Sequence, residues 1–207
     1  FVGMHPIPLL HGMTVGELAL MIKGEQWINQ AEQLTLDVIP VADYRHDMPY
    51  SLPVKPSPNL PNDQAIALYP SLGFFEATPL SVGRGTDFAF QVIGYDKFGP
   101  AEFRFTPESK PGAAVSPPLM NKNLFGEDLR QVKSTGLDLQ YLLRWQQRFN
   151  EHDAEFFNSP SFMDKLAGTD ALRLPIRKGM TEQEIRASWQ SALQQFKQQR
   201  QPYLLYP

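Results

Sequence analysis

The first pattern along the chain is a set of hydrophobic residues at helical spacing. Apolar residues spaced three to four positions apart predict a helix from Val15 to Lys23. Thr14 and Glu17 form a capping box, in which each side chain satisfies a free amide at the helix start, and Gly24 is the expected end. The pattern therefore places a helix directly after a loop that contains His11.

The last periodic stretch predicts one continuous helix over residues 182–199. Thr181 and Glu184 repeat the capping-box pattern at its start. Apolar side chains at helical spacing then share one face and are expected in the core: Ile185, Trp189, Leu193 and Phe196.

Alternating and short apolar runs predict strands between these helices. The run from Leu34 to Val41 alternates enough for a strand, and Pro40 places its end at a sheet edge. Three more strands are expected at 74–78, 90–93 and 103–106. Between residues 101 and 130, Pro and Gly separate the apolar pieces, which favours irregular strands over helices.

Further helical segments complete the pattern. They are expected at 64–69, 139–149, 162–166 and 171–177. The mixture of strands and helices predicts an α/β fold with α+β character.

A proline-rich segment separates the first predicted strand from the rest. Residues 42–63 hold no aromatic side chain after Tyr50, and a loop of this length in a compact domain is usually functional, a linker or disordered. Because polar side chains such as Asn59 stand here on a stiff backbone, we expect an ordered loop, with a domain boundary nearby.

Composition narrows the function classes. The 207 residues contain no cysteine, which removes disulfides, thiolate metal sites and a cysteine nucleophile. A net charge of −3 implies no basic face for nucleic acid or anionic lipid. No apolar run approaches the roughly 20 residues that span a bilayer. The first residues lack an initiator Met and a signal-peptide pattern, so we expect the chain to start inside a larger protein.

The stretch from Tyr69 to Gly94 carries the most informative chemistry. Its first apolar run contains one acid, Glu76, and a Gly-Arg-Gly-Thr turn follows with Arg84 at its centre. A buried, unpaired carboxylate would cost several kcal/mol, roughly, so Glu76 needs a cation, hydrogen-bond donors or a proton. Arg84 is the nearest candidate, and the flanking glycines allow the turn to approach a ligand closely.

Several roles remain open for this pair. Glu76 is suited to act as a general acid if its aromatic surroundings keep it protonated, or as an electrostatic partner if Arg84 keeps it ionised. Arg84 is better suited to clamp a carboxylate, because its planar fork donates two parallel hydrogen bonds. An internal ion pair that only fixes the turn is the structural alternative.

Other kinds of site find little support. The four histidines do not share metal-ligand spacing, and the chain has no phosphate-binding loop and no G-x-S-x-G nucleophile elbow. His11 is the histidine best placed for an anionic ligand, because it precedes a helix start. Sugar binding or acid chemistry remains, with Ser81, Thr86 and Asn59 as polar partners of the pair.

Four motifs resemble one family. The segments HPIPLLHGMTVGELA, PSPNLP, FEATPLSVGRGT with the following FQVIG, and RASWQSALQQFKQQRQPYLLYP are similar to those of the exo-β-N-acetylmuramidase family of the NamZ type. The similarity runs over nearly the whole chain.

The resemblance implies a fold and a domain order. Residues 1–41 would be the tail of a truncated N-terminal Rossmann-like catalytic domain, and residues 42–207 a smaller C-terminal α/β domain with a mixed sheet and flanking helices. The site would lie in a cleft between the domains, with the main catalytic acid upstream and substrate recognition by Arg84, Glu76, Ser81, Thr86, His11 and Asn59.

The resemblance also implies a function. The parent would be a glycoside hydrolase that releases N-acetylmuramic acid from non-reducing ends of peptidoglycan, outside the cytoplasm and without metal or cofactor. Its partners would be peptidoglycan fragments and the missing N-terminal domain, and this chain alone is an uncertain enzyme. The alternatives are a noncatalytic module that binds muropeptides or a partner protein, and a related enzyme for another sugar acid.

Overall fold

The computed structural model describes residues 5–134 and 136–207. They divide into two compact units, which we call the central unit (residues 51–185) and the terminal unit (residues 5–50 with 186–207). The terminal unit thus joins segments from both ends of the chain. The domain boundary expected at residue 41 stays a prediction.

The terminal unit is built on helices. It holds α1 (Val15–Gly24), a short 3-10 helix η1 (Ala31–Gln33), α7 (Gln190–Arg200) and η3 (Gln201–Tyr203). The capping box of α1 is confirmed: the Thr14 side chain accepts from the Glu17 amide and the Glu17 carboxylate accepts from the Thr14 amide.

The predicted strand over Leu34 to Val41 is wrong for this chain, because the segment has no strand assignment. The helix predicted over 182–199 is in fact two, α6 (Glu182–Ser188) and α7, separated at Trp189 with φ −105° and ψ 1°. In the expected stripe, Ile185 and Phe196 are buried, whereas Trp189 and Leu193 are only partly buried. The break turns the stripe, so the four side chains do not follow one helix face.

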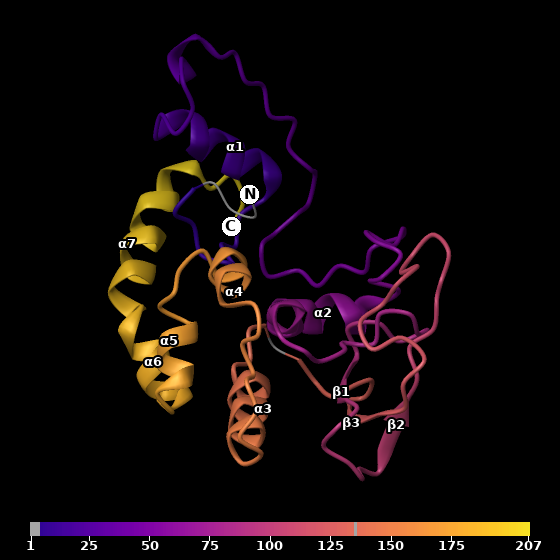
Figure 1. The fold of residues 1–207 in the computed structure, drawn as a ribbon. Coiled ribbons are helices and arrows are strands. Elements are labelled where there is room, and N and C mark those ends of the chain that lie inside the picture. The colour runs from indigo at the N-terminus through magenta and orange to yellow at the C-terminus, as the bar shows by residue number, and fades with distance from the viewer. Residues whose placement is uncertain (1–4, 135) are drawn as a thin grey trace. The chain divides into compact units, whose positions relative to one another are not determined.

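The central unit combines helices with a small sheet (Figure 1). Its helices are α2 (Asp63–Leu72), α3 (Gln140–Asn150), α4 (Pro160–Ala167) and α5 (Arg173–Arg177), with the 3-10 helix η2 (Gly73–Ala77) and most of α6. The helices expected in this half of the chain are therefore confirmed, with small shifts at their ends.

Three strands form the sheet, in the order β1 (Val92–Tyr95), β3 (Leu124–Asp128), β2 (Phe103–Phe105). Both pairings are antiparallel, so the mixed sheet that we expected is wrong for the described residues. Gly94 pairs with Gly126, and a side chain at Gly126 would meet the Ile93 carbonyl at 1.8 Å. The sheet therefore depends on close backbone approach at that point.

The strand expected at 74–78 is also wrong, because this run forms η2. The helical path of α2 continues through Gly73, whose φ is −58° and ψ −31°. Thr78 ends it by donating from its hydroxyl to the Phe75 carbonyl at 2.7 Å. Apolar side chains at successive positions of η2 are buried, Phe75 completely, so burial on both sides outweighs strand propensity here.

Candidate functional site

A cavity of about 250 Å³ in the central unit contains both Glu76 and Arg84. Glu76 comes from η2, and Arg84 from the turn that follows it. The remaining lining is mainly apolar and comes from three segments: Thr78, Leu80, Val82, Pro118 and Phe162. The residues that the sequence singled out as a pair are thus brought together in the wall of a small cavity.

The pairing of Glu76 with Arg84 has an unusual form. Arg84 Nε and Nη2 lie 2.8 Å and 2.5 Å from the same carboxylate oxygen, Oε1. The Phe90 ring centroid lies 5.0 Å from the guanidinium carbon, which adds a cation–π contact on one face. Within the described residues, Glu76 Oε2 and Arg84 Nη1 have no hydrogen-bond partner, so both remain available to a ligand.

The turn that carries Arg84 requires its glycines. Gly83 and Gly85 have φ of 79° and 84°, in the left-handed region that other residues rarely adopt. A side chain at Gly85 would also meet the Glu108 carbonyl at 2.4 Å. The turn is therefore pressed against the rest of the unit, which fixes the position of Arg84.

Ser81 and Thr86 hold this turn from inside. Ser81 is completely buried, and its hydroxyl accepts from the Gly83 amide at 3.1 Å. Thr86 donates to the Gly83 carbonyl at 2.6 Å and accepts from the Phe88 amide at 3.2 Å. Their hydroxyls thus serve the turn itself, and direct contact with a ligand stays a prediction for both.

Asn59 lies outside the lining of this cavity. It is 7% exposed, and its side chain donates to the Ala113 carbonyl at 3.0 Å. This bond ties the proline-rich loop to a distant part of the central unit. Ligand binding by Asn59 stays a prediction.

His11 belongs to the terminal unit. Its Nδ1 accepts from the Met13 amide at 3.2 Å, and its carbonyl accepts from Arg200 Nη1 at 2.5 Å. Burial, followed by the positive charge of Arg200, lowers the pKa of His11 below 6.5. The imidazole is therefore neutral at pH 7, and a neutral ring offers no positive charge to an anion.

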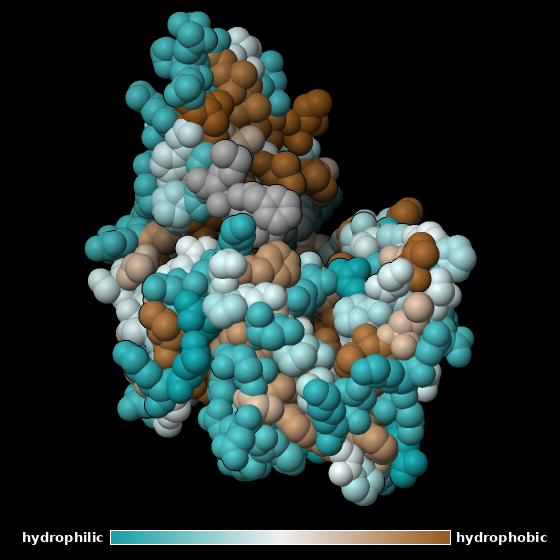
Figure 2. Space-filling model, viewed as in Figure 1, coloured by the Kyte–Doolittle hydropathy of each residue, from teal (hydrophilic) through white to brown (hydrophobic). Residues whose placement is uncertain are grey.

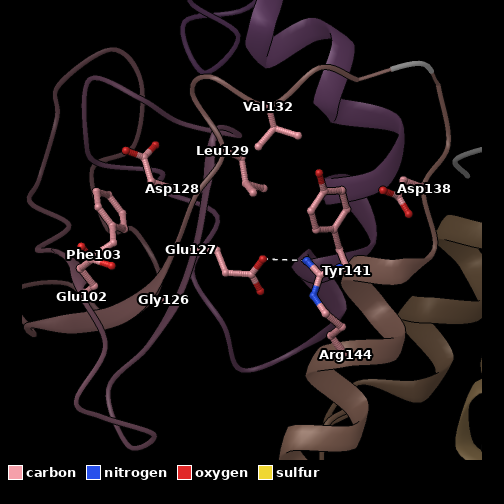
Figure 3. Close-up of a pocket in the computed structure, with 10 residues that line it drawn as sticks. All are labelled: Glu102, Phe103, Gly126, Glu127, Asp128, Leu129, Val132, Asp138, Tyr141 and Arg144. Atoms are coloured by element: carbon pink, nitrogen blue, oxygen red, sulfur yellow. Dashed lines mark hydrogen bonds and ion pairs between the residues drawn. The ribbon is translucent and has the colours of Figure 1, made fainter.

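A second, larger cavity of about 750 Å³ lies elsewhere in the central unit (Figure 3). Four acids and two aromatic rings contribute to its lining: Glu102, Glu127, Asp128, Asp138, Phe103 and Tyr141. Arg144 donates to Glu127 at 2.7 Å across the cavity and stacks on the Tyr141 ring at 5.0 Å. Sequence reasoning missed this cavity, because its residues come from three separate segments with no local motif.

Tyr141 is a titratable group of that cavity whose surroundings shift its pKa. Burial, then the negative charge of Asp138, raises the pKa of Tyr141 above its ordinary value. Its hydroxyl stays protonated and can donate a hydrogen bond at neutral pH.

The described residues lack a metal-ligand cluster and a membrane-spanning helix. No group of three or more His, Cys, Asp or Glu side chains there is arranged to hold a metal ion. No helix in this part of the chain is both long and apolar enough to cross a membrane.

Two family models match the chain in order. The model for the N-terminal part of exo-beta-N-acetylmuramidase NamZ matches residues 1–64, and the model for its C-terminal part matches residues 67–206. The peptidoglycan beta-N-acetylmuramidase NamZ of Bacillus subtilis (strain 168) is 34% identical over 225 residues, which cover 100% of this chain and 53% of that protein.

Two crystal structures of DUF1343 family proteins from Bacteroides fragilis NCTC 9343 are similar to the chain. One has a TM-score of 0.88 and 43% identity, covering 98% of this chain and 57% of the other. The second has a TM-score of 0.77 at 21% identity, covering 97% and 58%, and supports the fold alone. The chain therefore spans somewhat more than half the length of these relatives.

Proposed function

The chain belongs to the exo-β-N-acetylmuramidase NamZ family, and on that basis we propose that it is the C-terminal portion of a peptidoglycan hydrolase. The proposed reaction is release of N-acetylmuramic acid from non-reducing ends. The chain would supply substrate recognition, while an N-terminal domain of Rossmann-like fold, ending near residue 41, would supply the main catalytic acid.

The observation that carries the proposal is the Glu76–Arg84 pair in an otherwise mainly apolar cavity. N-acetylmuramic acid differs from other amino sugars of the wall by a lactyl ether, which ends in a carboxylate. Arg84 Nη1 has donors left for that carboxylate, since Glu76 occupies only the Nε and Nη2 side of the guanidinium.

The size of the cavity agrees with binding of only a part of the substrate. At about 250 Å³ it lies below the roughly 300–1,000 Å³ of typical small-molecule pockets. It therefore suits one substituent or one ring of a sugar rather than an oligosaccharide. Leu80 and Val82 would pack against the apolar parts of that substituent.

Glu76 is best explained as a residue that orients Arg84. Both guanidinium contacts converge on one of its oxygens, so the carboxyl group holds the guanidinium in a fixed position. A general acid would have to carry its proton beside this cation, and a neighbouring cation favours the charged form of a carboxyl group. We therefore assign the proton transfer to the upstream domain.

The test is hydrolysis of a chromogenic N-acetylmuramic acid β-glycoside by the natural protein at its full length. We expect release of the chromophore by that protein and none by the 207-residue chain alone. A folded full-length protein that leaves this substrate intact, while a known muramidase cleaves it under the same conditions, would contradict the proposal. Binding of muropeptides without cleavage would favour the noncatalytic module instead.

A site of action outside the cytoplasm follows from the proposed substrate, because peptidoglycan lies there. Fractionation of cells that produce the natural protein tests this. Recovery in the cytoplasm alone would contradict it.

A further inference from the structure

We propose that the cavity of about 750 Å³ in the central unit binds a small aliphatic ligand that carries both an ammonium group and a carboxylate. Such a ligand is a free diamino acid or a peptide that ends in one. The cavity shares no lining residue with the cavity of Glu76 and Arg84. The proposal does not rest on the proposed reaction, so an inactive enzyme would leave it standing.

The cavity has the size and the walls for this ligand. Its volume falls within the roughly 300–1,000 Å³ that is usual for small-molecule sites. One wall comes from β3 and the segments beside it, and the other from the start of α3 (Figure 3). Leu129 and Val132 add apolar surface against which an aliphatic chain packs. Figure 2 shows mainly hydrophilic surface over α3, which agrees with a small polar ligand rather than an apolar partner.

The acids of the lining outnumber the cations that pair with them. Arg130 neutralises Asp128, because its Nε and Nη2 reach the two carboxylate oxygens at 2.8 Å and 2.6 Å. Arg144 pairs with Glu127 through one oxygen, Oε2. Within the described residues, Glu102 and Asp138 have no ion-pair partner. The cavity therefore attracts a positively charged ligand.

An organic ammonium group suits these acids better than a metal ion. No three of the acids in the described part of the chain are arranged to hold a metal. Asp138 accepts from the Gln140 amide at 2.8 Å through Oδ1, which leaves Oδ2 for a ligand, and Glu127 keeps Oε1. An ammonium group has three rotatable donors, so it can bind acceptors that come from different segments.

Tyr141 is the independent sign of a ligand. Its side chain is only 5% exposed, and within the described residues no hydrogen bond reaches its hydroxyl. Figure 3 shows this hydroxyl turned into the cavity, toward the space between Val132 and Asp138. Buried hydroxyls are nearly always hydrogen-bonded, and a protonated one needs an acceptor. The ligand must therefore bring an acceptor as well as a cation.

Arg144 makes a carboxylate the acceptor that fits best. Its Nη2 donates to Glu127, whereas Nε and Nη1 have no acceptor among the described residues. The Tyr141 ring lies 5.0 Å from the guanidinium carbon, so both unused donor groups belong to one stacked pair of side chains. A carboxylate accepts strongly from a guanidinium and has further lone pairs for a hydroxyl.

Three ligands that differ by one group test this on the natural protein at its full length, by calorimetric titration. N-acetyl-L-lysine carries both charged groups, N-acetyl-L-norleucine lacks the ammonium, and pentylamine lacks the carboxylate. We expect N-acetyl-L-lysine to bind about tenfold or more tightly than either of the others, because each charged hydrogen-bonding group contributes at least that factor. The peptide Gly-Gly-Lys separates the two sources: tighter binding than N-acetyl-L-lysine identifies a peptide end, and equal binding identifies the amino acid.

Matched substitutions assign the binding to this cavity. Tyr141→Phe removes only the hydroxyl, and Asp138→Asn removes the charge but keeps an acceptor for the Gln140 amide. Each should weaken N-acetyl-L-lysine binding about tenfold, with little change in melting temperature. The controls are Tyr95→Phe, at a tyrosine that is also buried in the central unit, and Asp153→Asn, at an exposed acid there. Neither control residue lines the cavity, so both should leave binding unchanged.

Several results would overturn the proposal. They are equal affinity for N-acetyl-L-lysine and either of its two analogues, and absence of any binding at roughly 20 mM ligand. Equal effects of Tyr141→Phe and Tyr95→Phe would overturn it as well, because the binding would then lie elsewhere. If Tyr141→Phe does not fold, the comparison of the three ligands on the unchanged protein and the Asp138→Asn variant still decide.

Discussion

Glu17 and Leu205 are 188 positions apart in sequence, yet Glu17 Oε1 accepts a hydrogen bond from the Leu205 amide at 2.7 Å. The same oxygen accepts from His46 Nε2 at 2.9 Å, and Oε2 accepts from the Thr14 amide at 2.7 Å. The Glu17 side chain is completely buried. One capping carboxylate therefore joins the start of α1, the proline-rich segment and the last residues of the chain.

Replacement of Glu17 should destabilise the terminal unit. Hydrogen bonds to a charged group contribute about 1.5–3 kcal/mol, and Glu17→Gln leaves donors facing an amide that is uncharged. We expect a loss of roughly 2 kcal/mol in the free energy of unfolding, measured by urea denaturation followed by circular dichroism. Glu32→Gln is the control, since Glu32 is exposed, and a similar loss there would contradict the assignment.

The stability of the terminal unit should fall in acid. Burial raises the pKa of Glu17, but hydrogen bonds from Thr14, Leu205 and His46 outweigh it and hold the pKa below 4.5. A carboxyl whose pKa is depressed by folding stabilises the protein above its unfolded value and loses that effect as pH falls through the folded value. Thermal unfolding between pH 7 and 3 should therefore show a drop below about pH 4.5 that is smaller in Glu17→Gln.

Substitutions of Arg84 and of Glu76 should have different effects on the kinetic parameters. Arg84→Ala in the full-length protein should weaken substrate binding by about 1.5–3 kcal/mol, a rise in KM of roughly ten- to a hundredfold, because it removes a charged hydrogen bond. Arg84→Lys should recover only part of this, since an ammonium lacks the planar fork. An unchanged KM and kcat in Arg84→Ala would remove Arg84 from the site.

For Glu76→Gln we expect a moderate rise in KM with most of kcat retained, because the proposed role is to orient Arg84. A loss of kcat by a factor of about a hundred or more is typical of a missing general acid. That outcome, together with loss of one limb of the pH–rate profile, would return Glu76 to a catalytic role.

Gly85→Ala should damage both stability and binding. The left-handed backbone costs a non-glycine residue about 1–2 kcal/mol, and the new methyl group would collide with the Glu108 carbonyl. We expect a lower melting temperature and a raised KM, because the turn that carries Arg84 must shift. Gly112→Ala is the control, since Gly112 also has positive φ, 78°, but open space around it. Equal effects on KM would indicate general destabilisation.

Local chemistry made part of the structure predictable. The capping box at Thr14 and Glu17 concerns neighbours in sequence and follows from residue type alone. The Glu76–Arg84 ion pair was also predictable, because the acid and the cation lie on either side of a short, mainly apolar run. The contact of two Arg84 nitrogens with a single Glu76 oxygen was not predictable, because the sequence does not determine how η2 and the turn are oriented.

Nonlocal arrangement accounts for most errors. The hydrophobic pattern of residues 74–78 indicates burial on two sides. A strand and a 3-10 helix can both be buried in this way, so the pattern does not distinguish them. The larger cavity depends on the contact between Glu127 on β3 and Arg144 on α3. The distance between these two residues in the sequence does not predict that contact. The sequence shows Ser81 and Thr86 only as polar residues near a turn, because their hydrogen bonds inside the turn depend on its path in three dimensions.

The single shared oxygen of the Glu76–Arg84 pair gives the cavity a direction. Glu76 Oε2 is left as an acceptor at one end of the pair, and Arg84 Nη1 is left as a donor at the other. A ligand that carries an acidic group and a hydroxyl or amide N–H can satisfy both ends in only one orientation. The pair therefore selects a ligand by the order of its polar groups. A simple anion has no donor for Glu76 Oε2 and would leave that oxygen without a hydrogen bond.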